Sequence, residues 1–229
     1  MLMAYESPEL EGIPEAYIDK DHMYTGTKVI TTGIAYNTEI VKTAPASFAD
    51  LTTEAYKDNL IMPSPLYSGA AAYNLGVITR TEGMGWEYYE ALKANGITVD
   101  KGNGAVQNAI VAGDKGCGLL ADYMAIRSKN DGAPVEFVYP AEGSPAVTEP
   151  IGIVNTTDTP ELAEAFVDFV LSEEGQTLTS EIGYTPVKSG VAVPEGLKGI
   201  DEIELMTWDT EELYQNRDAD KDQFTQLFQ

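Results

Sequence analysis

A run of small residues follows two prolines in the segment PSPLYSGAAAYNLG, which extends from Pro63 to Gly76. The spacing predicts that a helix begins at Ser68. The first N–H groups of a helix have no partner within it, and the partial positive charge at this end favours an anion. Ser68 would supply a hydroxyl, and Gly69 would let a ligand approach the backbone. The alternative is that Ser68 serves only as an N-cap.

The signatures of several enzyme classes are absent from the chain. GNGAVQN begins like a dinucleotide-binding loop but has Gln107 in place of the third glycine, and neither a P-loop nor an H-E-x-x-H motif occurs. His22, the single histidine, lies in the polar segment DKDHMY and is expected to be a solvated surface residue. Cys117 is the single cysteine, which excludes an intramolecular disulfide and a cysteine zinc site. We expect no enzyme and no cofactor or metal; the alternative of another class is an α/β hydrolytic enzyme that uses carboxylates.

The charge balance excludes other classes of partner. The 229 residues include 14 basic and 37 acidic side chains, which gives a formal net charge of −23. Such a chain cannot neutralise the phosphates of nucleic acid in bulk, and an anionic membrane surface would repel it. The first residues, MLMAYESPEL, have neither the basic nor the apolar region of a signal peptide, and no apolar run approaches the ~18 residues of a membrane span.

Strands and helices are expected to alternate along the chain. Strands are predicted for residues 28–37 and for the segments LIMPSP, ITVDKG, CGLLAD, VEFVYP and AVTEPIGIVN. Helices are predicted at PASFADLTTEAYKDNL, from Ser68, at GMGWEYYEALKANG, at GNGAVQNAIVAGD, at 160–176, from Thr210 and around Gln223. The alternation indicates an α/β architecture with a mostly parallel sheet. Ligands of such sheets bind beyond the carboxyl ends of the strands, where the stretch after Pro63 lies.

Six segments in this order resemble the solute-binding proteins of bacterial ABC importers, in particular the branch that includes ferric-ion, phosphonate and sugar-phosphate binders. They are GIAYNTEIV with APASFADL, IMPSPLYSGAAAYNLG, GWEYYEALKANG, GNGAVQNAIVAGDKGCGLLADY, EPIGIVNTTDTPELAEAFVDFVLSEEGQ and GYTPV. The resemblance covers nearly the whole chain. It implies a periplasmic-binding-protein-like α/β fold, in which two lobes joined by two hinge strands close on a solute.

The resemblance also implies how the chain is divided. Residues 28–150 would form one complete lobe, with hinges near 31–37 and 149–154. Residues 1–27 and 151–229 would form part of the other lobe, whose N-terminal sheet-forming segment is missing from this sequence. The helix predicted at 160–176 has an apolar face that would rest on that sheet, made of Leu162, Phe166, Phe169 and Val170. Because exposed apolar faces mark interfaces, a homodimer through the incomplete lobe is expected.

Family positions carry over to residues at two of the predicted helix starts. Ser68, Gly69 and Ala70 match a Ser-Gly helix start that, in the family, binds an oxyanion group or the anion that accompanies iron. Asn103 lies between two glycines and matches a position whose side chain reaches the same anion. A turn residue that tolerates a left-handed conformation would explain Asn103 equally well.

Three further residues are carried over as ligand candidates. Tyr123 matches one of two adjacent tyrosines that ligate ferric ion in some members, but here Met124 stands in the second place, and a thioether is a poor ligand for a hard ion. Tyr123 remains a hydroxyl donor to a solute or, alternatively, a half-buried tyrosine at a strand end. Asp122 and Glu149 are lesser candidates, and Glu149 could accept a hydrogen bond from a sugar or an amine.

The function implied by the resemblance is capture of a small anionic solute, a sugar phosphate or a phosphonate, as the substrate-binding component of an ABC import system. Its partners would be the membrane permease and its ATPase, and its location would be extracytoplasmic, in the periplasm or at the cell surface. Ferric-ion binding is the alternative within the family. A receptor lobe used for interaction without transport is a further alternative.

Overall fold

The computed structural model describes all residues from 1 to 229 and contains two compact units. The larger unit comprises residues 31–147 and 203–229, and the smaller unit comprises residues 1–30 and 148–202. Two long strands, β2 (Thr25–Asn37) and β7 (Ser144–Ile151), each contribute residues to both units. None of the helices combines the length and the apolar character that crossing a membrane requires.

The sheet of the larger unit is mixed rather than mostly parallel. The strand order is β10-β7-β2-β5-β3-β4, and β6 also pairs with β2. β3 (Leu60–Pro63) runs parallel to β4 (Thr98–Asp100) and to β5 (Cys117–Ala121). β2 pairs antiparallel with β5 and with β6 (Val135–Val138), while β10 (Leu205–Met206) pairs parallel with β7. The expectation of a mostly parallel sheet was therefore wrong for β2, because both β5 and β6 run antiparallel to it.

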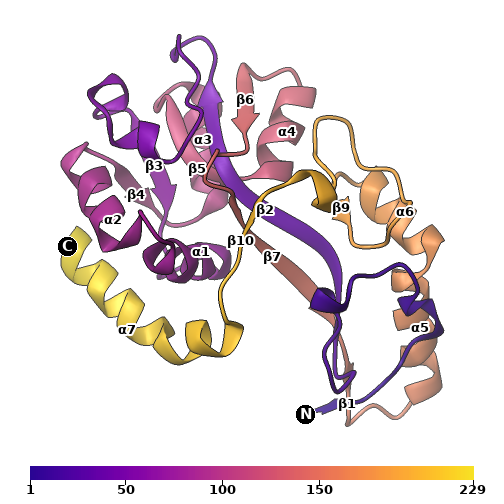
Figure 1. Ribbon diagram of the computed structural model, residues 1–229. Helices are drawn as coiled ribbons and strands as arrows, with labels where there is room; N and C mark the ends of the chain where they lie inside the picture. Colours follow the sequence, from indigo (N-terminus) through magenta and orange to yellow (C-terminus); the bar gives the residue numbers. More distant parts are fainter. The chain divides into compact units, whose positions relative to one another are not determined.

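Helices cover both faces of this sheet (Figure 1). α1 (Gly69–Arg80), α2 (Gly85–Ala94) and α7 (Thr210–Phe228) share one core with Leu60 and Met62 of β3. α3 (Asn103–Ala112) and α4 (Asp122–Asn130) share a second core with Ile61. Alternate residues of a strand point to opposite faces, so the continuous apolar run of β3 supplies both cores. Where one or two helices were expected before β3, the chain forms the short 3₁₀ turns Ala49–Thr52 and Glu54–Tyr56.

The C-terminal helix α7 belongs to the larger unit, which corrects the expectation that residues 151–229 all belong to the partial lobe. It is also one helix and not two. Figure 1 shows α7, in yellow, running along α1. Arg80 of α1 donates to both carboxylate oxygens of Asp220 at 2.8 and 3.2 Å, in a partly buried pair. The buried side chains of Leu213 and Phe224 supply the apolar contact that holds α7 in place.

The smaller unit is built around α5 (Pro160–Leu171) and α6 (Glu173–Glu181). Its short strands are β1 (Leu2–Met3) with β8 (Ile153–Val154), and β9 (Thr185–Pro186), which pairs with residues 28–29 of β2. The helix expected at 160–176 is interrupted at Ser172, whose Oγ accepts a hydrogen bond from the N–H of Gly175 and so starts α6. The remaining 3₁₀ turns are Pro8–Leu10, Glu15–Tyr17 and Ile200–Glu202.

One side of α5 is held by the N-terminal segment and the other is exposed. Tyr5 and Ser7 donate hydrogen bonds to the carboxylate of Asp168. On the opposite side, Leu162 is 70% exposed and Phe166 is 60% exposed, and Phe169 is exposed as well. This agrees with the expected apolar face, except that Val170 is half-buried. His22 also differs from expectation, because its Nδ1 is buried and has no hydrogen-bond partner.

Candidate functional site

Three helix N-termini lie at one edge of the sheet in the larger unit. The neighbouring parallel strands β3, β4 and β5 are followed in the chain by α1, α3 and α4. The carboxyl ends of parallel strands meet at the same edge, so Ser68, Asn103 and Asp122 come to one side of the molecule. The backbone N–H of Ser64, just after β3, donates to the carbonyl of Asp100 at 2.6 Å and ties the first two of these loops together.

The start of α1 agrees with the sequence prediction. Ser68 is the N-cap, with φ −110° and ψ 122°, and its Oγ accepts a hydrogen bond from the N–H of Ala71 at 3.2 Å. Ser68 is therefore a cap in this structure, and its hydroxyl proton is still available to a second acceptor. The N–H groups of Gly69 and Ala70 point out of the first turn without a partner in the helix. Gly69 is exposed, and Ala70 is half-buried.

The start of α3 lacks a side-chain cap. Gly102 occupies the N-cap position, and Asn103 is the first residue of the helix. The turn role considered for Asn103 is thus replaced by a helical one. Its side chain is half-buried, and no hydrogen bond from it to the rest of the chain is formed. The second helix start therefore offers free N–H groups and a free carboxamide.

At three positions near these helix starts, neither the backbone conformation nor the neighbouring atoms require glycine. Most of the chain's 21 glycines either have positive φ or lie so close to other atoms that a Cβ would collide with them or be crowded. Gly69, Gly102 and Gly104 have neither property, and a Cβ at each would meet no atom within 4 Å. Two are the residues on either side of Asn103, and the third follows Ser68. The open space beside them lies where the helix dipoles of α1 and α3 favour negative charge.

Asp122 is buried, and its carboxylate links β2 to the start of α4 by hydrogen bonds. Its side chain is 1% exposed, and it accepts hydrogen bonds from Thr31 Oγ1 and from the N–H of Tyr123, each at 2.7 Å. Burial raises its pKa from 3.8 to about 6, against the lowering effect of hydrogen bonds from Thr31, Tyr123 and Tyr139. Both carboxylate oxygens are engaged within the protein. Asp122 therefore contributes to the edge by joining β2 to α4.

Tyr123 and Met124 point to different surroundings. Tyr123 is half-buried, and the guanidinium of Arg127 lies 5.5 Å from its ring centre. Met124 packs against the core shared by α3 and α4, so the thioether does not join the tyrosine. No group of three or more His, Cys, Asp or Glu side chains is arranged to hold a metal ion.

Glu149 lies in the smaller unit, whereas the other candidates all lie in the larger one. Its exposed carboxylate forms an ion pair with Lys28. The Lys28 ammonium also lies 4.8 Å from the ring centre of Tyr184. The structure thus gives Glu149 a partner within its own unit, on the adjoining strand.

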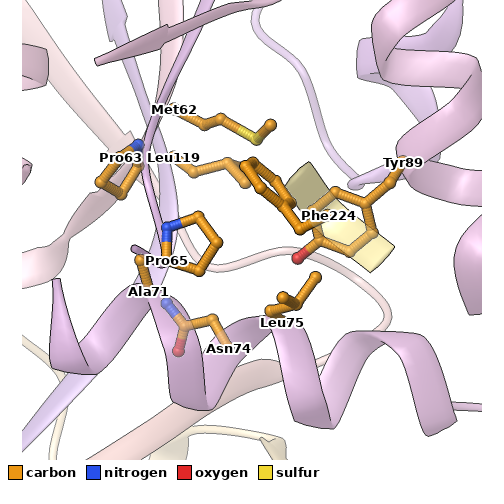
Figure 2. Close-up of a pocket in the computed structure, with 9 residues that line it drawn as sticks. All are labelled: Met62, Pro63, Pro65, Ala71, Asn74, Leu75, Tyr89, Leu119 and Phe224. Atoms are coloured by element: carbon orange, nitrogen blue, oxygen red, sulfur yellow. The ribbon is translucent and has the colours of Figure 1, made fainter. Parts of the chain in front are cut away.

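Two hollows beside the helix starts were not anticipated from the sequence. One is a small apolar cavity of about 20 Å³. Figure 2 shows the side chains that line it, among them Phe224 of α7, Tyr89 of α2, Met62 of β3 and Leu75 of α1. The second is a groove of about 280 Å³ at the carboxyl ends of β3 and β4 and the end of α7, lined by Ser64, Leu66, Tyr67, Val99, Asp100, Lys101, Phe224, Thr225, Phe228 and Gln229. These residues are distant in sequence, and the only local signal was the aromatic Tyr67 directly before Ser68.

Comparison with known families decides the class of the chain. Residues 1–216 match the model of the bacterial extracellular solute-binding protein family. The chain belongs to this family. Two relatives of known sequence are an uncharacterised protein of Haemophilus influenzae, 27% identical over 201 residues, and a protein of Salmonella typhimurium named for periplasmic binding of 2-aminoethylphosphonate, 26% identical over 205 residues. The matches cover 80% and 83% of this chain but 56% and 58% of the relatives, so the chain spans little more than half of their length.

Solved structures confirm the periplasmic-binding-protein fold. AfuA from Actinobacillus pleuropneumoniae, with fructose 6-phosphate bound, matches with a TM-score of 0.85 and 23% identity over 99% of this chain and 76% of its own. Iron-bound HitA from Pseudomonas aeruginosa matches with a TM-score of 0.82 and 20% identity over 97% of this chain and 76% of its own. The α/β fold class expected from the resemblance is thereby confirmed.

Proposed function

We propose that this chain is the substrate-binding component of an ABC import system and captures a small oxyanion-bearing solute, a sugar phosphate or a phosphonate. Family membership supports the binding role. Relatives named for a phosphonate and solved with a sugar phosphate support the class of solute. The binding residues proposed on the larger unit are Ser68, Gly69, Ala70 and Asn103, with Tyr123 as a neighbouring hydroxyl.

The observation that carries this proposal is the open space at Gly69, Gly102 and Gly104. An oxyanion in that space would accept hydrogen bonds from the free N–H groups of two helix starts, from Ser68 Oγ and from the Asn103 amide. Each bond to a charged oxyanion contributes about 1.5–3 kcal/mol. Glycine permits the contact, since any side chain at these positions would stand between the ligand and the backbone.

Replacing Ser68 by alanine is expected to weaken anion binding. Phosphate, a sugar phosphate or a phosphonate should raise the melting temperature of the unchanged protein by binding the native state. Ser68→Ala should reduce that rise, with a loss of about 1–3 kcal/mol in binding free energy for one hydrogen bond to a charged group. Differential scanning fluorimetry with a ligand titration measures both.

The matched control is Ser172→Ala. The Oγ of Ser172 accepts a hydrogen bond from the N–H three residues later and so caps α6, as Ser68 caps α1. Both variants should therefore lose about 1 kcal/mol of capping energy. Only Ser68→Ala should change the ligand-dependent rise. If phosphates, phosphonates and sulfate shift neither the unchanged protein nor the variants, the anion site is refuted.

Self-association through the exposed face of α5 is also expected. Leu162, Phe166 and Phe169 form an uncovered apolar surface on this helix, and such surfaces mark contacts with other proteins. Light scattering should show a dimer, and Phe166→Glu should shift it to the monomer. The control is Tyr214→Glu, at an aromatic residue of α7 that is 72% exposed. A monomer of the unchanged protein at all concentrations would contradict this expectation.

The remaining functional inferences follow from the proposed import role. The permease and ATPase are proposed as membrane partners, and the periplasm or cell surface as the location. Residues 28–150 are proposed as the complete lobe, extended by the C-terminal helix. We still predict that the protein does not bind ferric ion through a tyrosine pair, because Met124 takes the place of the second tyrosine and a thioether is a poor ligand for a hard ion. Carboxylate-based hydrolysis remains the alternative of another class.

A further inference from the structure

We propose that the groove between the carboxyl ends of β3 and β4 and the end of α7 receives the apolar or aromatic body of the solute. The solute is then an organic phosphate or phosphonate with a flat, hydrophobic substituent. This inference rests on the proposed function and adds the chemical nature of the part of the solute that carries no oxyanion.

The groove directly adjoins the proposed anion site. Tyr67 in its wall is followed by Ser68, the cap of α1, and Lys101 in its wall is followed by Gly102, the cap of α3. The N–H groups of Tyr67 and Ser68 both donate to the carbonyl of Ser64, which also lines the groove. A ligand whose oxyanion lies at the two helix starts therefore has its remaining atoms next to this groove.

The lining of the groove suits a flat apolar group. Phe224 and Phe228 stack with ring centres 4.5 Å apart and planes at 29°, and with Leu66 and Val99 they supply apolar wall. Tyr67 is 72% exposed, so its ring is accessible to a ligand in the groove. Rings favour offset or edge-to-face contact with aromatic side chains, in addition to the gain from burying their surface.

One ammonium side chain, that of Lys101, lines the groove. Lys101 is exposed and takes part in none of the six ion pairs of the structure. Asp100 is the only acidic side chain in the lining, where its Oδ1 accepts the backbone N–H of Lys101, and the lining also includes Gln229, the last residue of the sequence. In a chain with a net charge of −23, this places a free ammonium beside the helix starts. The volume of about 280 Å³ is close to the lower end of small-molecule pockets, ~300 Å³.

The test compares two phosphonates with the same anionic group. Titration calorimetry with methylphosphonate and phenylphosphonate should give an affinity about tenfold higher for the phenyl compound, as expected for burying one ring face. In Tyr67→Ala and in Phe228→Ala this ratio should fall below about threefold. Tyr67 is exposed, so its variant is expected to fold normally even if Phe228→Ala does not. Tyr214→Ala, at an exposed tyrosine of α7 outside the groove, should keep the full ratio.

The outcomes separate this inference from the proposed function. If methylphosphonate binds and phenylphosphonate binds no better, the groove assignment is overturned while the anion site stands. A phenyl preference that persists in Tyr67→Ala and Phe228→Ala overturns it too, because the ring then lies elsewhere. If neither compound binds, the proposed oxyanion function itself is refuted.

Discussion

Replacing Phe224 by alanine is expected to lower the free energy of unfolding of the larger unit by about 3–5 kcal/mol, the usual cost of removing a buried phenyl ring. Phe224 is 2% exposed and contacts Tyr89 edge to face at 6.2 Å and Phe228 by stacking at 4.5 Å. It closes the small cavity shown in Figure 2, so alanine would enlarge an existing void instead of allowing the walls to collapse.

Urea unfolding followed by tryptophan fluorescence measures this loss. Trp86 and Trp208 are the only two tryptophans, and both lie in the larger unit, so the signal reports that unit. The control is Tyr214→Ala on the same helix, where the side chain is exposed and a change within about 0.5 kcal/mol is expected. Equal stabilities of the two variants would show that α7 does not depend on Phe224 for its position.

The strongest local signals in the sequence predicted the parts of the site that depend on nearby residues. Ser68 begins α1 because its side-chain Oγ accepts a hydrogen bond from the N–H of Ala71, one of the first N–H groups that the helix itself leaves unpaired. The strand at β3 and the helix at α3 were predicted from apolar runs and glycine boundaries, and both occur at those positions. The starts of α1 and α3 were therefore predicted from spacing, and the role of their N–H groups in holding an oxyanion stays a proposal.

Features that depend on distant residues were missed. β2 is antiparallel to β5, which a strand pattern does not encode because orientation is decided by the path of the chain between them. α7 was placed with the wrong unit, since the match between Phe224 and the α1–α2 surface is invisible in either segment. The groove joins residues 64–67, 99–101 and 224–229, so it exists only in the folded chain. Asp122 was taken for a ligand candidate because sequence does not report burial.

The buried position of Asp122 leads to a prediction about pH. Its pKa is raised from 3.8 to about 6 by burial. Between these values the unfolded chain has lost the proton and the folded protein retains it, so the free energy of unfolding falls as pH rises from about 4 to 6. Above pH 6 the carboxylate is ionised in both states, and the folded state is destabilised because the charged group is buried away from water. A shift of about two pKa units corresponds to about 3 kcal/mol.

Asp122→Asn isolates this contribution, because the amide has no proton to lose. The altered hydrogen bonds to Thr31 and Tyr123 should destabilise the variant by an amount that does not depend on pH. The free energy of unfolding of the variant minus that of the unchanged protein should therefore rise by about 3 kcal/mol from pH 4 to pH 7. Asp114→Asn removes the same charge from an exposed position and should show no such change with pH. Urea unfolding of all three proteins at several pH values gives the differences. A difference between Asp122→Asn and the unchanged protein that stays constant from pH 4 to pH 7 would mean that Asp122 is ionised at no cost, with solvent or a cation reaching the carboxylate at this edge of the sheet.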